Sequence, residues 1–177
     1  GSTIMSYAGT CDPNNVQNNS DDYFHISSLL QGQEFIWQGN GTICGTVITL
    51  DHTTPEASIQ VPSNLFIPIG TPFQLTGSAT DAEGDALTYC WEEFDLGPQS
   101  PYGDPKGSSP AFRSYPPTSS PIRVFPRLQL ILTNGTSKSE VLPDTTRNFT
   151  FRMTVRDNHP GGGGFDWKEV KFKSTYL

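Results

Sequence analysis

The feature that most constrains the fold is a run of alternating apolar and polar residues in the last third of the sequence. Phe149, Phe151, Met153 and Val155 alternate with Thr and Arg over residues 149–156. A period of two places successive side chains on opposite faces of a β-strand, whereas a helix needs apolar residues three or four positions apart. The segment therefore predicts a strand with one buried face.

The same alternation recurs at residues 73–79, 87–92 and 170–173. Turn signals separate these segments at residues 81–85, 134–135 and 161–164, and the 177 residues include 17 Gly and 15 Pro. Several short strands between such turns are typical of an antiparallel sandwich. We expect a mainly β fold, with an immunoglobulin-like antiparallel β-sandwich over residues 55–177.

The expected core of this sandwich follows from the apolar positions of the alternating runs. Its members are Phe73, Leu75, Leu87, Tyr89, Trp91, Phe151, Met153 and Val155. Residues 97–126 are rich in proline but carry Phe112, Tyr115, Val124 and Phe125. Aromatic anchors in a connection of this length predict an ordered insertion that lies over the sheet.

Residues 1–50 have a different pattern, with one amphipathic helix between loops. Tyr23, Ile26, Leu30 and Trp37 recur at the helical period, Ser20 is the expected N-cap, and the glycines at 39 and 41 end the helix. One such helix cannot bury its own apolar face. We expect residues 1–50 to be the end of a larger domain, whose helix here docks on the sandwich, pairs with another copy or stays mobile.

Charge and cysteine usage narrow the class of protein. The net charge of −7 argues against nucleic-acid binding, and no apolar run is long enough for a membrane span. The three cysteines form no Cys-x-x-Cys pair. We expect Cys11 and Cys44 to form a disulfide and Cys90 to be a buried free thiol, which together with the low lysine content indicates a secreted, extracellular protein.

The sequence Thr-Ile-Met-Ser-Tyr at residues 3–7 resembles the Met-turn of metzincin zinc endopeptidases. Ala-Gly-Thr-Cys, an Asn-rich loop and the helix opening at residues 20–25 follow it, as in the C-terminal end of reprolysin-like metalloproteases. The resemblance implies that Met5 supports the zinc site without binding zinc. Tyr7 takes the position of a tyrosine that in some metzincins ligates zinc or steadies the oxyanion; ordinary packing is the alternative.

Segments of the sandwich are also similar to the immunoglobulin-like domains attached to such enzymes, at residues 71–89, 110–117, 123–127, 140–143 and 152–158. The resemblance makes residues 1–50 the loop-plus-helix end of a catalytic domain and residues 55–177 an accessory domain. Zinc, the rest of that domain and a protein or peptide substrate would then belong to the parent protein.

Zinc ligands are not expected in this chain. It has no His-Glu-x-x-His, and its three histidines, His25, His52 and His159, are far apart in the sequence. Zinc hydrolysis needs about three fixed protein ligands and an open position for water. We therefore expect no peptidase activity and no stoichiometric zinc in the chain by itself, a structural role for His25, and solvated side chains for His52 and His159.

A calcium site is a further candidate. Asp81, Glu83 and Asp85 crowd one turn, and Asp157 ends the predicted strand at 149–156. Carboxylates from such turns bind calcium when they meet at one pole of a sandwich, although the same residues also form ordinary turns. Two further functions fit the sequence: an extracellular adhesion or ligand-binding module, and a spacer domain without a ligand.

Overall fold

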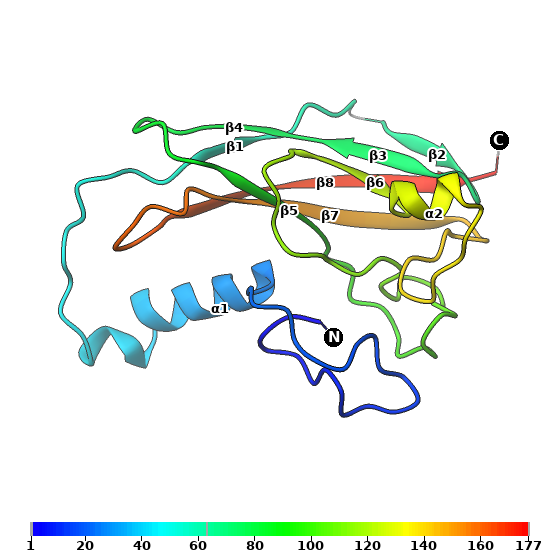
Figure 1. Cartoon of the computed structure of the whole chain (residues 1–177), viewed down its shortest axis with the longest axis horizontal. Helices are drawn as coiled ribbons and strands as arrows, with labels where there is room; N and C mark the ends of the chain where they lie inside the picture. The colour runs from blue at the N-terminus through cyan, green and yellow to red at the C-terminus, as the bar shows by residue number, and fades with distance from the viewer. Residues whose placement is uncertain (1, 63, 177) are drawn as a thin grey trace.

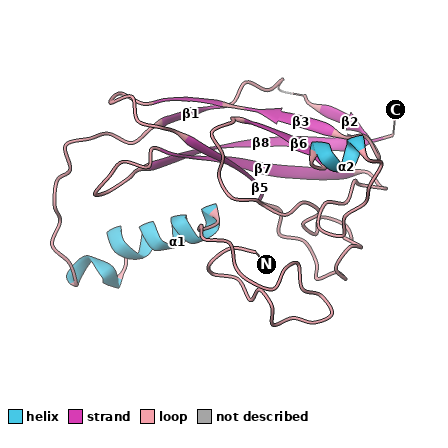
Figure 2. Ribbon diagram, in the orientation of Figure 1, coloured by secondary structure: helices cyan, strands magenta, loops and turns pink. Residues whose placement is uncertain are grey.

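The computed structural model describes residues 2–62 and 64–176, and the protein is mainly β (Figures 1 and 2). The helical elements are α1 (Ile26–Trp37), η1 (Asn40–Ile43) and α2 (Leu128–Leu132). The strands are β1 (Glu56–Ser58), β2 (Phe66–Pro68), β3 (Phe73–Thr76), β4 (Ser78–Thr80), β5 (Thr88–Glu93), β6 (Ile122–Phe125), β7 (Arg147–Arg156) and β8 (Phe165–Thr175).

The strands form one larger sheet and two small ones. The four-stranded sheet has the order β2-β8-β7-β5, while β1 pairs with β4 and β3 pairs with β6. All pairs are antiparallel except β2 with β8, in which Phe66 lies beside Lys173 in parallel register. The expectation of a purely antiparallel arrangement is therefore wrong at this edge, because β2 runs in the same direction as β8.

The segment with the clearest alternation becomes β7, a central strand of the larger sheet. Met153 lies opposite Trp91 of β5, and Phe151 lies opposite Val170 of β8. The inner face of this sheet packs against β1, β3 and β6 in one apolar cluster. In Figure 1 the strands β1, β3 and β4 lie on one side of β7 and β8, and α1 lies on the other.

The centre of the core is aromatic. Phe151 contacts the rings of Phe125 and Phe172, whose centroids lie 4.8 and 5.7 Å from its own. Leu75, Trp91, Phe151, Met153 and Val155 are buried as expected, whereas Phe73, Leu87 and Tyr89 are partly buried against the same cluster. The strand phasing deduced from the alternation is therefore confirmed.

The proline-rich segment at residues 97–126 is ordered, as expected, but it does more than lie over the sheet. Its end forms β6, which pairs with β3 so that Phe125 lies opposite Phe73. Phe112 and Phe125 are buried in the core. The insertion therefore supplies one of the strands that cover the larger sheet.

Gly77 lies where the chain passes from β3, which pairs with β6, to β4, which pairs with β1. A Cβ at this position would overlap Sδ and Cε of Met153, a fully buried side chain. We expect Gly77→Ala to lower the free energy of unfolding by about 1–3 kcal/mol, because the core would have to shift. Urea denaturation checks this, with Gly45→Ala as the control, since Gly45 has open space around it.

Helix α1 begins later than expected. His25 is its N-cap, with Nδ1 accepting a hydrogen bond of 3.1 Å from the amide of Ser27. Ser20 is therefore not the cap. The residues before His25 are not helical, and their backbone is hydrogen-bonded to the start of the chain: the amide of Asp21 donates to the carbonyl of Ser2, and that of Ile4 to the carbonyl of Tyr23. The helix ends at Trp37, as the glycines at 39 and 41 indicate.

Candidate functional site

The segment that resembles a Met-turn does form a turn. The amide and the hydroxyl of Ser6 both donate to the carbonyl of Thr3, at 2.9 and 2.6 Å. Ser2 and Thr3 are buried, and the backbone bonds to residues 21 and 23 hold this turn beside the start of α1. Met5 is thus carried by a fixed piece of backbone.

The side chains of the turn itself point to solvent. Met5 is 69% and Tyr7 is 80% exposed. The last turn of α1 and the residues that follow it also leave apolar side chains uncovered. These are Phe35, Ile36, Trp37, Ile43, Val47 and Ile48. The first 50 residues therefore present a series of large apolar side chains that the described part of the chain does not cover.

The start of α1 is fixed to the larger sheet by a buried carboxylate. Glu92 projects from β5 on the outer face of the larger sheet, and its Oε1 and Oε2 accept the amide hydrogen of Ile26 at 3.1 and 3.3 Å. The hydroxyl of Thr154, on neighbouring β7, donates to Oε2 at 2.6 Å. Glu92, Ile26 and Thr154 have no exposed surface. The free amide at a helix N-terminus is a favourable partner for this negative charge.

Three further contacts join the residues just before α1 to the β-rich part of the chain at residues 55–177. The Arg113 guanidinium lies 2.9 Å from Asp21 Oδ2, and the Tyr23 hydroxyl donates to Ser114 Oγ at 2.5 Å. Arg156 donates to the carbonyl of Phe24 at 2.8 Å. We call the contacts made by Glu92, Arg113, Ser114 and Arg156 with residues 21–26, together with the hydrogen bond from Thr154 to Glu92, the junction.

Burial controls the electrostatics of the junction. Desolvation raises the pKa of Glu92, while His25 and the hydroxyl of Thr154 oppose that rise. His25 Nε2 lies 3.9 Å from Glu92 Oε1, and the imidazole stacks on Phe94 with centroids 6.3 Å apart. His25 therefore has the structural role that the sequence predicted, as the helix cap beside a buried carboxylate.

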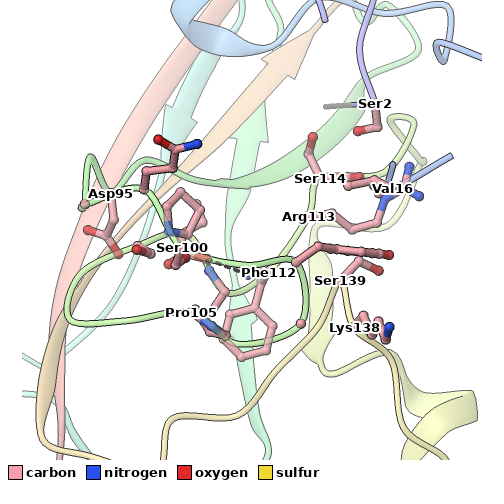
Figure 3. Close-up of a pocket in the computed structure, with 18 of the residues that line it drawn as sticks. Ser2, Val16, Asp95, Ser100, Pro105, Phe112, Arg113, Ser114, Lys138 and Ser139 are labelled. Carbon is pink, nitrogen blue, oxygen red and sulfur yellow. Dashed lines mark hydrogen bonds between the residues drawn. The ribbon is translucent and has the colours of Figure 1, made fainter. Parts of the chain in front are cut away.

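A hollow of about 630 Å³ opens next to the junction. Figure 3 shows Asp95 and Ser100 on one side of it, Ser2 and Arg113 on the other, and Phe112 between them. Asp95 is already engaged, since its Oδ1 accepts the amide of Thr150 at 3.0 Å and its Oδ2 lies 3.3 Å from Arg147. The hollow is lined by residues from the first 50 positions and from residues 55–177. It contains both acidic and basic side chains.

Each of the four carboxylates considered for calcium already has a hydrogen-bond partner in the chain, although Asp81 Oδ2 is buried without one among the described residues. Asp81 Oδ1 accepts the amides of residues 83 and 85, and Glu83 accepts hydrogen bonds from Thr53. Asp85 Oδ2 lies 2.7 Å from His159 Nδ1, and both oxygens of Asp157 accept the amide of Gly164. Among residues 2–62 and 64–176, no group of three His, Cys, Asp or Glu side chains is arranged to hold a metal ion.

His52 and His159, which we expected to be solvated at separate places, are neighbours in the structure. The rings of His52 and His159 stack with centroids 4.4 Å apart. The hydrogen bond with Asp85 raises the pKa of His159. The stacked rings therefore bring the connection between α1 and β1 into contact with the turn after β7. The sequence pattern contains no signal for this contact.

The cysteines are free thiols in this structure. Cys11 and Cys44 are exposed and unpaired, so the expected disulfide between them is not formed here. Cys90 is buried, as expected, and its Sγ donates to the carbonyl of Tyr115 at 3.2 Å. Burial raises the pKa of the Cys90 thiol, which makes it unreactive while the fold is intact.

Sequence reasoning missed the residues of the junction, above all Glu92 and Arg113. One signal was present: two glutamates, Glu92 and Glu93, end a strand that otherwise contains buried residues. A charged residue at a buried strand position needs a partner. The partner of Glu92 is more than 60 positions away in the sequence, so the pattern alone does not identify it.

Comparison with known proteins gives no relative: no protein-family model, curated protein or solved structure matches this chain. Within the described residues, no helix has the length and apolar character to cross a membrane.

Proposed function

We propose that this chain is part of a secreted, zinc-dependent endopeptidase of the metzincin type. In this proposal residues 1–50 supply the Met-turn and the last helix of the catalytic domain, and residues 55–177 form an immunoglobulin-like accessory domain. The zinc ligands and the substrate-binding cleft come from the rest of the parent protein. The resemblance of residues 3–7 and of the segment after them gives the reaction class.

The observation that carries the proposal is the uncovered apolar surface of residues 1–50. Met5 and Tyr7 lie on a turn whose backbone is hydrogen-bonded in place, and Trp37 is 61% exposed at the end of a formed helix. Each large apolar side chain gains about 1.5–3 kcal/mol when it is buried. Exposed side chains on a fixed backbone fit a surface completed by further protein.

The proposal makes a direct prediction for the full-length protein. It should bind one equivalent of zinc and cleave peptides, a zinc chelator should abolish the cleavage, and added zinc should restore it. The chain of 177 residues by itself should do neither. Metal analysis and a peptide-cleavage assay on both proteins check this.

Hydrogen exchange gives a second, independent test. In the full-length protein the amides of residues 33–37 should exchange at least about tenfold more slowly than in this chain, because burial of Phe35, Ile36 and Trp37 stabilises the end of α1. The amides of β7 serve as the control and should not change. A full-length protein that holds no zinc, or in which residues 33–37 exchange as in this chain, would refute the proposal.

A second candidate function is an extracellular ligand-binding module. The hollow of about 630 Å³ beside the junction favours it, because small-molecule sites are concavities of about 300–1,000 Å³. The metal analysis separates the two functions: a peptidase requires zinc in the full-length protein, and a binding module does not.

A further inference from the structure

We propose that the sandwich positions the Met5 turn of the catalytic domain through Glu92, and does not hinge freely as a separate accessory domain. This inference rests on the proposed function, and it assigns to the sandwich a role in the reaction itself. Glu92 is then a positioning residue, since it acts on the turn through α1 and the backbone around it.

A continuous series of contacts connects Glu92 to the turn. Glu92 holds the amide of Ile26, and the residues just before it are paired through their backbone with the start of the chain. The carbonyl of Tyr23 accepts from the amide of Ile4, the residue next to Met5, at 3.1 Å. Two short hydrogen-bonded steps therefore separate the buried carboxylate from the turn.

The burial of these groups makes the contact rigid. Ile26, Glu92 and Thr154 have no exposed surface, and Tyr23 is also buried. Relative motion is the default between domains whose interface is small and polar, and the polar contacts of the junction differ from this case because the groups at their centre are fully buried. Separation of residues 21–26 from the larger sheet would break the hydrogen bonds between Glu92 and Ile26 and would expose the buried side chains of Ile26 and Tyr23 to water, so it is costly.

The junction also fixes orientation, because its contacts lie at several points. Arg113 and Ser114 hold residues 21 and 23 from the proline-rich insertion, while Glu92 and Arg156 hold residues 26 and 24 from the larger sheet. Contacts from two separate elements prevent rotation about any single one. The position of residues 2–6 relative to the sheet is thereby determined.

The first part of the test uses hydrogen exchange in this chain. Glu92→Gln keeps the size of the side chain but removes its charge and places an amide donor beside the donors of Ile26 and Thr154. We expect the amide of Ile26 to exchange about tenfold faster or more, because only one oxygen is then left to accept from both Ile26 and Thr154 and the new amide donor faces their donors. Thr154→Val, which removes one donor to Glu92, should give a smaller increase at the same amide.

Glu140→Gln is the matched control. Glu140 is a buried carboxylate like Glu92, but its side-chain partners Arg123 and Arg127 lie in residues 55–177, and no hydrogen bond or ion pair joins its side chain to residues 2–37. This variant should lower the melting temperature without faster exchange at Ile26. If Glu92→Gln does not fold, exchange at the amide of Ile26 is compared between Thr154→Val and Glu140→Gln instead.

The second part uses the full-length protein. Glu92→Gln should lower kcat by about 10- to 100-fold, because small displacements of a catalytic centre have effects of this size, while KM and the zinc content stay unchanged. Glu140→Gln should keep the kcat of the wild type. A loss that came only from lower stability would affect both variants alike.

The outcomes separate this inference from the proposed function. If Glu92→Gln speeds exchange at Ile26 but the full-length variant keeps its kcat, the positioning role is wrong and the peptidase proposal stands. Unchanged exchange at Ile26 in both Glu92→Gln and Thr154→Val would also overturn the positioning role. A wild-type protein without zinc or cleavage activity would refute both proposals, whatever the exchange data give.

Discussion

Phe151→Ala is expected to lower the free energy of unfolding by about 3–5 kcal/mol, the range for removal of a buried aromatic ring. Phe151 has no exposed surface and contacts other rings on both sides, at 4.8 Å from Phe125 and 5.9 Å from Phe149. The cavity would lie between the larger sheet and the strands β3 and β6 that pack against it, where neither can collapse without breaking strand pairs. Urea denaturation followed by tryptophan fluorescence measures the loss.

Phe66→Ala is the matched control for this substitution. Phe66 belongs to β2 of the same sheet, but its side chain is 55% exposed. The expected loss is below about 1 kcal/mol, because little of the ring leaves water on folding. Equal losses in the two variants would show that the aromatic cluster does not dominate the stability of the core.

Arg147→Met is expected to destabilise the fold by about 3–5 kcal/mol at pH 9, because the buried Glu93 loses its charged partner and must either stay charged without it or take up a proton at a pH that opposes this. Arg147 Nη2 lies 3.1 Å from Glu93 Oε1, and Nη1 donates to the carbonyl of Ser109 at 2.8 Å. The Oε2 of Glu93 accepts the amides of Ala111 and Phe112. Chemical denaturation at fixed pH measures the effect.

The loss should be smaller at pH 5, to about 1–2 kcal/mol, which is the value of neutral hydrogen bonds. Burial raises the pKa of Glu93 to about 8, whereas Arg147 and the two amides lower it. Between the ordinary glutamate pKa of about 4.3 and the raised value, the folded state binds more protons than the unfolded state. The contribution of Glu93 to stability is therefore largest at low pH and falls as the pH rises toward 8.

The double variant Glu93→Gln/Arg147→Met gives the control for charge. In this variant Asp95 is the only carboxylate that has lost Arg147 as a partner, so the part of the destabilisation that differs between pH 5 and pH 9 because of Glu93 should disappear. A single Arg147→Met variant with the same loss at both pH values would contradict the assignment of Glu93 as the source of the pH dependence.

The sequence determined the strands whose apolar side chains alternate. The period of two in residues 149–156 fixed both the existence of β7 and the face on which Phe151, Met153 and Val155 lie, because the pleat sends successive side chains to opposite faces. The same reasoning gave Leu75 and Trp91 as core residues. Helix α1 was also predictable, since its end is set by local signals at residues 39–41.

The pairing of the strands could not be predicted from the sequence pattern. The parallel pairing of β2 with β8 and the pairing of β6 with β3 depend on how distant segments meet, and the alternation within one strand contains no information about its neighbour. The start of α1 has the same cause. Ser20 is a good cap by its chemistry, but the hydrogen bonds of Asp21 and Tyr23 to the start of the chain hold the following residues in a non-helical conformation.

The candidate site was decided by tertiary structure almost entirely. The sequence pointed to Met5 and Tyr7 through a local resemblance, and the fold places them on a fixed, exposed turn. The residues that hold that turn, Glu92 and Arg113, carry no local motif. Their roles arise because burial forces each charged group to find a partner, and the partner is chosen by where the folded chain brings a helix amide or an opposite charge.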